Sequence, residues 1–391
     1  MNFDLSDEER AFEREVEAFL VEHGTDQVCD RNPEQLSQTV DTPAKRAFMR
    51  KLAERGWLGM SWPKEYGGRE LSGIYDFLLT EALSRHGAPQ PGKGVGIVGK
   101  TLIRHGSEKL KREFLPRIIR GEIEFAIGYS EPQAGSDAAN MQLRATRVEG
   151  GWRLDGRKIW TTSAHFADWY WLGARTDPDA PKHQGITLCL LPMHHPGLTI
   201  HPTWTIGDER TNEVFFDDVF VADDFVVGQL NSGWTYICEA LDLERFAMMP
   251  VGPLEKKLEA LVERVRAVAR DGRPLRHDPR ARARLARLAT ELEVSRMLQR
   301  RVIASALAGG IPTVQSSMYK LFMNQTGQRM ADAALDLLGP EAQLRPGEAG
   351  APVGGRFERS YRYTVVDTIG GGTSEIQKNI IARRGLGLPP T

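Results

Sequence analysis

A run of glycines near the carboxyl end of the chain precedes residues that can hold a ligand. Gly370, Gly371 and Gly372 stand directly before Thr373 and Ser374. Three flexible residues in a row cost stability unless the backbone needs the space, so the run favours close approach by a ligand. A hydroxyl of Thr373 or Ser374 can cap the helix that follows, and the positive end of that helix suits the oxygen atoms of a phosphate or cofactor. Capping alone would also explain Thr373.

Residues 125–137 combine small side chains with polar groups. They read Phe-Ala-Ile-Gly-Tyr-Ser-Glu-Pro-Gln-Ala-Gly-Ser-Asp. Small side chains and polar backbone let a chain approach a planar ring closely, which is what the binding of a flat cofactor requires. The alternative is an ordinary loop of proline and glycine, and a lone Ser-Glu-Pro would favour that alternative.

A third stretch places a carboxylate among apolar side chains. Glu244 and Arg245 lie between Leu243 and a run that contains Phe246 and Met248. A carboxylate in an apolar, water-poor pocket has its pKa raised toward neutrality, which makes it a better base. The alternative is a solvated helix residue, or one paired with an arginine.

These stretches resemble the signatures of the acyl-CoA dehydrogenase family. The segment from Asp367 to Arg383 is similar to the C-terminal signature of that family, and residues 125–137 are similar to the segment that holds the flavin and the fatty-acyl pantetheine. Gly156-Arg-Lys-Ile-Trp-Thr-Thr-Ser-Ala resembles the strand beside the flavin. The resemblance covers nearly the whole chain. It implies an FAD-dependent oxidoreductase that acts on the CH–CH bond of an acyl-CoA thioester, with the α-proton passing to a carboxylate and the β-hydride to flavin N5.

The resemblance also implies roles for individual residues. Ser130 would bond the flavin ring, Trp160 would shield one face of the isoalloxazine, and Thr162 would hydrogen-bond its N5 region. The full set of implied FAD contacts is Ile127, Tyr129, Ser130, Gly135, Ser136, Trp160, Thr161, Thr162, Thr373 and Glu375. The implied substrate contacts are Ser136, Asp242, Arg245 and Gly372.

The base departs from the commonest pattern of the family. In many members the residue before the final Gly-Thr is the glutamate that removes the proton, and here that residue is Gly371. Leu241-Asp-Leu-Glu-Arg-Phe-Ala-Met-Met resembles the segment from which the isovaleryl and long-chain branches offer their glutamate, directly before an arginine. The resemblance therefore implies Glu244 as the base and Arg245 as its catalytic neighbour. It also implies a bulky, branched or steroid side-chain acyl group as substrate.

Two family motifs that grip the adenine-diphosphate half of a neighbour's FAD are missing. The regions that would carry them are residues 265–276, Val-Arg-Ala-Val-Ala-Arg-Asp-Gly-Arg-Pro-Leu-Arg, and residues 335–342, Leu-Asp-Leu-Leu-Gly-Pro-Glu-Ala. The chain thus keeps the motifs for the isoalloxazine half of the site and lacks those for the adenine half. The same division occurs among paired bacterial dehydrogenases that shorten steroid side chains. Residues 171–186 also resemble that group. We therefore expect an oligomer, a heterotetramer with a related subunit. The rival is a homotetramer in which Arg273 or Arg276 binds the pyrophosphate.

The resemblance leaves other functions open. A non-catalytic subunit that binds FAD and CoA for a partner enzyme is one alternative, and an acyl-CoA oxidase is another. For a dehydrogenase, the expected electron acceptor is an electron-transfer flavoprotein.

Composition narrows the class of protein further. The chain has 391 residues and a formal net charge of −1. Its net charge therefore creates no overall electrostatic field that would favour binding to nucleic acid or to an anionic membrane. No segment approaches about 18 uninterrupted apolar residues, and the start lacks a basic leader with an apolar run. We expect a cytoplasmic protein. The cysteines Cys29, Cys189 and Cys238 form no disulfide or zinc pattern, and the nine histidines show no ligand spacing, so no metal site is expected.

The pattern along the chain predicts an α+β fold in three domains. Residues 1–122 read as an N-terminal helical domain, residues 123–232 as a β-barrel of short strands, and residues 233–391 as a four-helix bundle. Asp155-Gly156 is expected to form a hairpin turn. Long helical runs are expected at 234–270, 279–309, 312–338 and 357–384, and shorter ones at 43–55, 72–86, 92–105 and 107–120.

Overall fold

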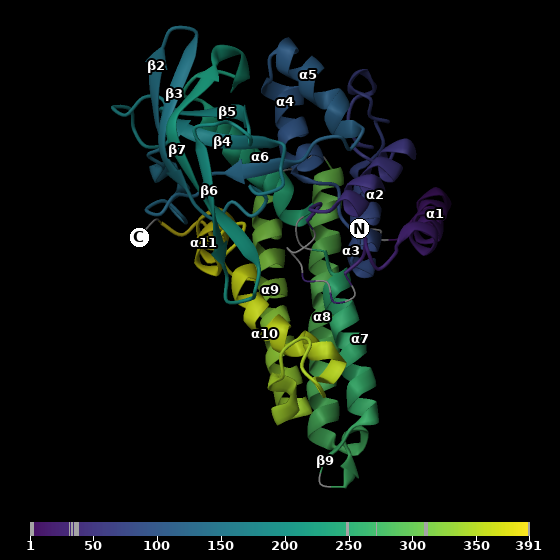
Figure 1. Ribbon diagram of the computed structural model, residues 1–391. Helices are drawn as coiled ribbons and strands as arrows, with labels where there is room; N and C mark the ends of the chain where they lie inside the picture. Colours follow the sequence, from purple (N-terminus) through teal and green to yellow (C-terminus); the bar gives the residue numbers. More distant parts are fainter. Residues whose placement is uncertain are drawn as a thin grey trace.

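The computed structural model describes residues 4–30, 32, 34, 39–247, 250–270, 272–308 and 312–389, without the side chains of 242–247. Figure 1 shows a helical lobe and a twisted sheet side by side at one end of the molecule. A long helical bundle runs away from them to a tapered end. The predicted α+β fold of helical, β and helical parts is confirmed.

The N-terminal lobe is built from short helices that match the predicted runs closely. The first begins with a capping box, in which the Ser6 hydroxyl accepts from Glu9 N and the Glu9 carboxylate accepts from Ser6 N. The run predicted at 92–105 begins instead as a π-helix over Gly94–Gly99, where a Cβ on Gly99 would lie 2.1 Å from the Trp62 ring. The elements are α1 (Asp7–His23), α2 (Pro43–Glu54), α3 (Gly73–His86), η2 (Gly94–Gly99), α4 (Lys100–His105) and α5 (Glu108–Ile119).

The middle part is an eight-stranded, mostly antiparallel sheet with the order β6-β7-β3-β2-β4-β5-β8, in which β1 pairs with β4 in parallel. Alternate residues of β4 enter different cores: Tyr170 and Leu172 pack inside the sheet, whereas Trp171 packs against the helices behind it. The strands are β1 (Phe125–Gly128), β2 (Arg144–Val148), β3 (Gly151–Lys158), β4 (Trp169–Arg175), β5 (Ile186–Pro192), β6 (Leu198–Trp204), β7 (Arg210–Ala222) and β8 (Val226–Val227).

The expected turn at Asp155-Gly156 is wrong. Both residues lie inside β3, where the pairing with β7 shifts between Leu154 and Gly156, and Gly156 has φ 137°. The turn between β2 and β3 falls earlier, with Gly150 in the left-handed region at φ 75°. An Asp-Gly pair suits a tight turn, but a β-bulge needs a glycine for the same conformational reason.

The C-terminal bundle has more breaks than the sequence predicted. The run at 234–270 is two helices, because Pro250 and Pro253 interrupt the hydrogen-bonded ladder, and the run at 357–384 breaks at the glycine run. The elements are α6 (Gly233–Ala247), α7 (Gly252–Ala267), β9 (Ala269–Arg270), β10 (Arg273–Pro274), α8 (Pro279–Leu307), α9 (Thr313–Leu338), α10 (Arg356–Asp367) and α11 (Ser374–Ile380).

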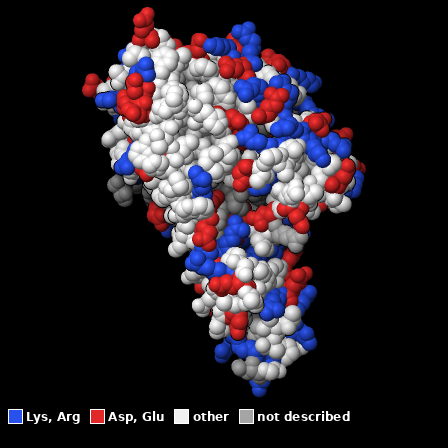
Figure 2. Space-filling model, viewed as in Figure 1, with Lys and Arg blue, Asp and Glu red and all other residues white. Residues whose placement is uncertain are grey.

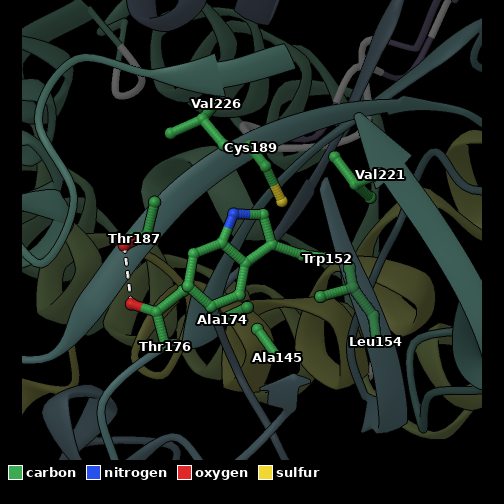
Figure 3. A pocket seen from close by; sticks show the side chains of 9 residues that line it. All are labelled: Ala145, Trp152, Leu154, Ala174, Thr176, Thr187, Cys189, Val221 and Val226. Atoms are coloured by element: carbon green, nitrogen blue, oxygen red, sulfur yellow. Dashed lines mark hydrogen bonds between the residues drawn. The ribbon is translucent and has the colours of Figure 1, made fainter. Parts of the chain in front are cut away.

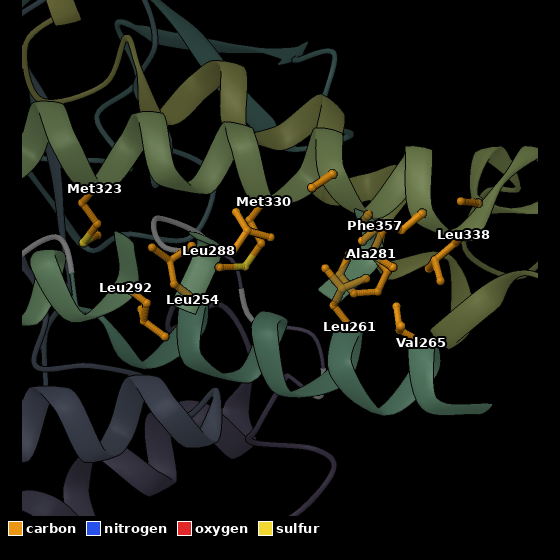
Figure 4. Packing of buried hydrophobic residues seen from close by; sticks show 14 of the residues in the cluster. Leu254, Leu261, Val265, Ala281, Leu288, Leu292, Met323, Met330, Leu338 and Phe357 are labelled. Carbon is orange, nitrogen blue, oxygen red and sulfur yellow. The ribbon is translucent and has the colours of Figure 1, made fainter. Parts of the chain in front are cut away.

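Aliphatic and methionine side chains fill the space between the long helices. In Figure 4, Leu254 and Leu261 of α7 face Leu288 of α8 and Met330 of α9. This packing makes the bundle a rigid support for the loops at its upper end.

Candidate functional site

A buried ion pair ties the loop after β1 to the end of β3. Lys158 Nζ lies 2.8 Å from Glu131 Oε1, and the two side chains are 0% and 1% exposed. The Glu131 carboxylate also accepts from the backbone N–H of Gln142 at 2.6 Å and of Leu143 at 2.9 Å. Desolvation lowers the pKa of Lys158 despite its carboxylate partner. The glutamate of the Ser-Glu-Pro sequence therefore points into the protein and braces the loop.

Backbone bonds bring the two stretches expected at the flavin next to each other. Ile159 N donates to Ser130 O at 3.0 Å, and Lys158 Nζ reaches Tyr129 O at 3.4 Å. The Tyr129 hydroxyl accepts from Trp171 Nε1 at 2.8 Å. The two stretches thus lie side by side, next to Ile127 on β1.

Trp160 is held outward in a strained backbone conformation. Its φ is 62°, in the left-handed region that bulky residues avoid, and its side chain is 56% exposed. Such strain persists only where the surroundings enforce it, and it collects at functional sites. An exposed indole next to a polar loop is a flat apolar platform of the kind that a planar ring stacks on.

Asn212 of β7 fixes the two residues that follow Trp160. Thr161 N donates to Asn212 O at 3.0 Å, and Asn212 Nδ2 donates to Thr161 O at 2.8 Å and to Thr162 O at 3.4 Å. The Thr161 hydroxyl is buried against the Tyr170 hydroxyl at 2.9 Å. Thr161 thus acts from inside the sheet, and its contact with FAD stays a prediction. Thr162 remains half-buried at the surface.

The glycine run forms a left-handed turn before α11. Gly371 and Gly372 have φ values of 65° and 94°. A Cβ on Gly372 would lie 2.7 Å from Gln377 Nε2, which donates to Gly372 O at 3.1 Å. The Thr373 hydroxyl accepts from Ile376 N at 3.2 Å and so caps α11. Capping was the alternative explanation of this residue in the sequence. Glu375 is exposed, 3.9 Å from Lys378 Nζ.

The predicted base and two predicted substrate contacts lie on α6. Asp242, Glu244 and Arg245 fall within the helix that spans Gly233–Ala247. Their side chains lie outside the part of the chain that the structure describes, so their roles stay predictions.

The described surface fits a flavin. It offers the Trp160 indole, the hydroxyl-bearing Ser130 and Thr162, the exposed Gly135 and Ser136 of the same loop, and a left-handed turn at Gly372. Behind that turn, Gln377 Oε1 is buried and has no hydrogen-bond partner among the described residues.

The interior of the sheet does not fit a ligand. Its cavity measures only about 10 Å³, and Figure 3 shows the Trp152 indole filling the space beside Cys189 and Leu154. A larger depression of about 340 Å³ lies on the surface between α4, β8 and α6, lined by Arg104, His105 and Tyr236 among others.

The regions that lack the adenine-binding motifs are bonded to each other at the tapered end. Arg270 of β9 donates to Asp336 O and Leu337 O at 3.0 Å each, and Arg284 lies 2.7 Å from the Asp336 carboxylate. Arg273 and Arg276 are exposed beside them, and Figure 2 shows basic side chains gathered at this end. Figure 1 places the hairpin far from the sheet, so these arginines cannot reach the flavin surface of their own chain.

The sequence did not predict three positioning residues, Glu131, Lys158 and Asn212. The Glu131–Lys158 pair joins positions 27 residues apart in two motifs, and Asn212 carries no motif at all. Lys158 shares its strand with the charged residues Arg153, Asp155 and Arg157, so its residue type did not mark it as buried. Elsewhere, Cys29, Cys189 and Cys238 form no disulfide, and the described residues contain no cluster of three or more metal-ligating side chains.

Among the described residues, no helix has the length and apolar character that crossing a bilayer requires.

Family models and curated relatives that match this chain all belong to the same family. Three acyl-CoA dehydrogenase domain models match the chain: the N-terminal domain over residues 6–122, the middle domain over 126–219 and the C-terminal domain over 231–386. The acyl-CoA dehydrogenase FadE29 of Mycobacterium tuberculosis is 32% identical over 100% of this chain and 99% of its own length. Acyl-CoA dehydrogenase FadE26 of the same organism is 33% identical over 88% of each chain.

Solved structures agree with the sequence matches. A chain of the Tcur3481-Tcur3483 steroid ACAD superposes with a TM-score of 0.89 at 32% identity, over 100% of both chains. A chain of the ChsE4-ChsE5 complex from Mycobacterium tuberculosis superposes with a TM-score of 0.89 at 31% identity, again over 100% of both. This chain belongs to the acyl-CoA dehydrogenase family of FAD-dependent oxidoreductases.

Proposed function

We propose that this chain forms the α,β-double bond of an acyl-CoA thioester with Glu244 as the base. The observation that supports this most is the strained, exposed Trp160, held beside the Ser130 loop by Lys158 and Asn212. That surface is built for a flat cofactor. Glu244 is the carboxylate on α6 whose surroundings in the sequence suit a base, since Gly371 leaves none on the glycine run.

Different residues bind the cofactor, contact the substrate and remove the proton. The backbone around Ser130, the half-buried Thr162 and the Trp160 indole would hold the flavin, and Ser136 and Gly372 would contact the thioester. Glu244 takes up the α-proton, and Asp242 and Arg245 of the same helix contact the substrate. FAD, when bound, accepts the hydride from the β-carbon.

The proposed substrate is a bulky, branched or steroid side-chain acyl-CoA. One related structure supports this class, since it is named a steroid ACAD and the chain aligns with it over its whole length. Isovaleryl-CoA dehydrogenase of Solanum tuberosum, at 29% identity, supports branched acyl groups. The segment around Glu244 on α6 resembles the one from which the isovaleryl and long-chain branches offer their base.

The proposed assembly is a heterotetramer with a related subunit. The related structures named Tcur3481-Tcur3483 and ChsE4-ChsE5 each contain two different chains. At the tapered end of this chain, Arg270 and Arg284 bond to α9 of the same chain. This favours an adenine-diphosphate site that residues of another subunit complete. The proposed electron acceptor is an electron-transfer flavoprotein, and the proposed compartment is the cytoplasm.

An exposed apolar patch supports a partner chain near the flavin surface. Trp204 and Ile206 of the β6–β7 hairpin are 66% and 64% exposed, and Val365 of α10 and Ile369, two residues after the end of α10, are exposed as well. Arg362 fixes the two elements together, because it donates to Ile206 O at 2.6 Å and pairs with Asp208 at 2.6 Å. Aromatic and aliphatic side chains on a rigid support are typical of interface cores.

The second candidate is a non-catalytic subunit that holds FAD and CoA for its partner. Gly371, at the position where many members carry the base, favours it. The two candidates differ in whether Glu244 matters.

The test is anaerobic reduction of bound FAD by a branched or steroid side-chain acyl-CoA, followed by absorbance, with the related subunit co-expressed. Glu244→Gln should abolish the reduction. Glu239→Gln is the matched control, because Glu239 lies on the same helix but bonds His105 at 2.8 Å. Reduction at the unmodified rate by the Glu244→Gln protein would favour the non-catalytic subunit.

A further inference from the structure

The carboxylate of Glu81 binds the first turn of a helix in another part of the molecule. Glu81 lies on α3, and its oxygens accept from Val251 N at 3.2 Å and from Gly252 N at 3.3 Å, at the start of α7. Gln299 of α8 donates to the same carboxylate. Glu81 is not among the site residues that the family resemblance implies.

The start of α7 depends on this carboxylate because its own sequence provides no cap. The N-cap residue is Val251, which is buried and has no side-chain acceptor. The first N–H groups of a helix need acceptors, and a negative charge is favoured at that end. Glu81 therefore supplies in space what Ser, Thr or Asp usually supplies in sequence.

The contact between α3 and α7 leaves little freedom. A Cβ on Gly252 would lie 2.8 Å from Arg85 Cα and 2.8 Å from Arg85 N, so the backbones approach as closely as glycine allows. At the rim of the same contact, Arg85 pairs with Glu255 at 2.5 Å and with Glu259 at 2.9 Å. The start of α7 is thus fixed to α3 by close packing, a buried cap and exposed ion pairs.

The junction that Glu81 fixes directly follows the helix of the proposed base. The helix α6 ends at Ala247, and α7 begins at Gly252 with Val251 as its N-cap. Val251 stands seven positions after Glu244 in the sequence. Because so few residues separate the two helices along the chain, fixing the start of α7 restricts where the last turn of α6 can lie.

Resting on the proposed function with Glu244 as base, we propose that Glu81 is a positioning residue for catalysis. By holding the N–H groups of Val251 and Gly252, it fixes the α6–α7 junction and with it the placement of Glu244 relative to the α-carbon of the substrate. Proton abstraction depends steeply on such placement, and an error near 1 Å costs on the order of 100-fold in rate.

The test compares Glu81→Leu and Glu81→Gln with Arg85→Gln in the FAD-loaded complex. Leucine removes both acceptors, whereas glutamine keeps one carbonyl oxygen toward the N–H groups and can pair with Gln299 after that amide turns over. Arg85→Gln is the control, because it breaks the ion pairs of the same helix contact and leaves the cap intact. The readouts are the rate constant of flavin reduction, its isotope effect with α-deuterated substrate, the substrate Kd and the FAD content.

We expect Glu81→Leu to slow flavin reduction roughly 10- to 100-fold, with an undiminished α-deuterium isotope effect and an FAD content equal to that of the unmodified protein. The rate constant of flavin reduction for Glu81→Gln should lie between those of Glu81→Leu and the unmodified protein. Arg85→Gln should reduce flavin at the unmodified rate. If Glu81→Leu does not fold, Glu81→Gln decides the question.

Two results would overturn the proposal: Glu81→Gln and Glu81→Leu proteins that reduce flavin at the unmodified rate, or a loss confined to substrate Kd. Glu244→Gln separates this from the proposed function. A Glu244→Gln protein that still reduces flavin removes the base assignment itself, whereas an inactive Glu244→Gln beside fully active Glu81 variants removes only the positioning role.

Discussion

Lys158 Nζ and Glu131 Oε1 meet at 2.8 Å inside the protein, and this pair joins the two loops on which a flavin is expected to rest. Burial penalises both charges, and only their pairing and the backbone N–H groups on Glu131 offset that cost. The cofactor surface thus depends on a contact that faces away from it.

Lys158→Met should destabilise the chain strongly, because it leaves the Glu131 carboxylate buried without a cation. Breaking such a pair costs about 3–5 kcal/mol. Thermal unfolding and FAD content measure the effect, and both should fall. The double variant Glu131→Gln/Lys158→Met should recover part of the loss. A double variant as unstable as the single one would show that the ion pair is not what braces the loop.

Trp160→Gly should separate strain from binding. Glycine adopts φ 62° at no steric cost, so the FAD-free protein should be at least as stable to heat as the unmodified one. Loss of the stacking surface should weaken FAD binding about two- to tenfold, since aromatic pairs contribute about 0.5–1.5 kcal/mol. Trp160→Phe should retain most of the affinity. Equal FAD affinity of the glycine and tryptophan proteins, measured by titration calorimetry, would remove the platform role.

Asp367 should make stability fall as the pH rises through neutrality. Desolvation raises its pKa from 3.8 to about 7, although Lys257 and Lys320 oppose the shift. The folded protein therefore binds a proton that the unfolded chain has released between those two values. This contribution to stability is fully present below about 4 and is lost as the pH passes about 7, with a slope of up to about 1.4 kcal/mol per pH unit.

The measurement for Asp367 is Tm between pH 5.5 and 8 for the unmodified protein and for Asp367→Asn. Asparagine cannot titrate, so its curve should be flatter over this range. Because Glu81, Glu124 and Glu209 also have pKa values raised to about 7, the difference between the curves carries the test. Parallel curves would assign the slope to those other groups.

Ile206→Glu should weaken assembly with the related subunit, since it places a charge in the apolar patch between the β6–β7 hairpin and α10. The measurement is native mass by light scattering after co-purification. Val21→Glu is the control, because Val21 on α1 is exposed and apolar but lies far along the chain from the patch. A complex of unchanged mass and affinity with Ile206→Glu would place the interface elsewhere.

The sequence predicted much of the fold because its helices carry local signals. Ser6 and Glu9 form a capping box, and α3, α5, α8 and α9 end within two residues of their predicted limits. Family motifs also singled out the stretches around Ser130 and Trp160, and the structure brings these stretches next to each other. These signals lie within a few residues of the structure that they specify.

What the sequence did not predict depends on contacts between distant segments. Asp155-Gly156 suits a turn in isolation, but pairing with β7 makes it a bulge. The inward role of Glu131 follows from Lys158, and the cap on Val251 comes from Glu81, which is 170 residues away. Such pairs leave no periodic or local pattern.

The most direct test of the central claim is mass spectrometry of the thioester formed from a branched or steroid side-chain acyl-CoA. The assay uses the FAD-loaded complex with an electron acceptor. The account predicts a product lighter by two hydrogens from the unmodified protein and from Glu239→Gln, and only unchanged substrate from Glu244→Gln. An enoyl product formed by Glu244→Gln at the unmodified rate would contradict it.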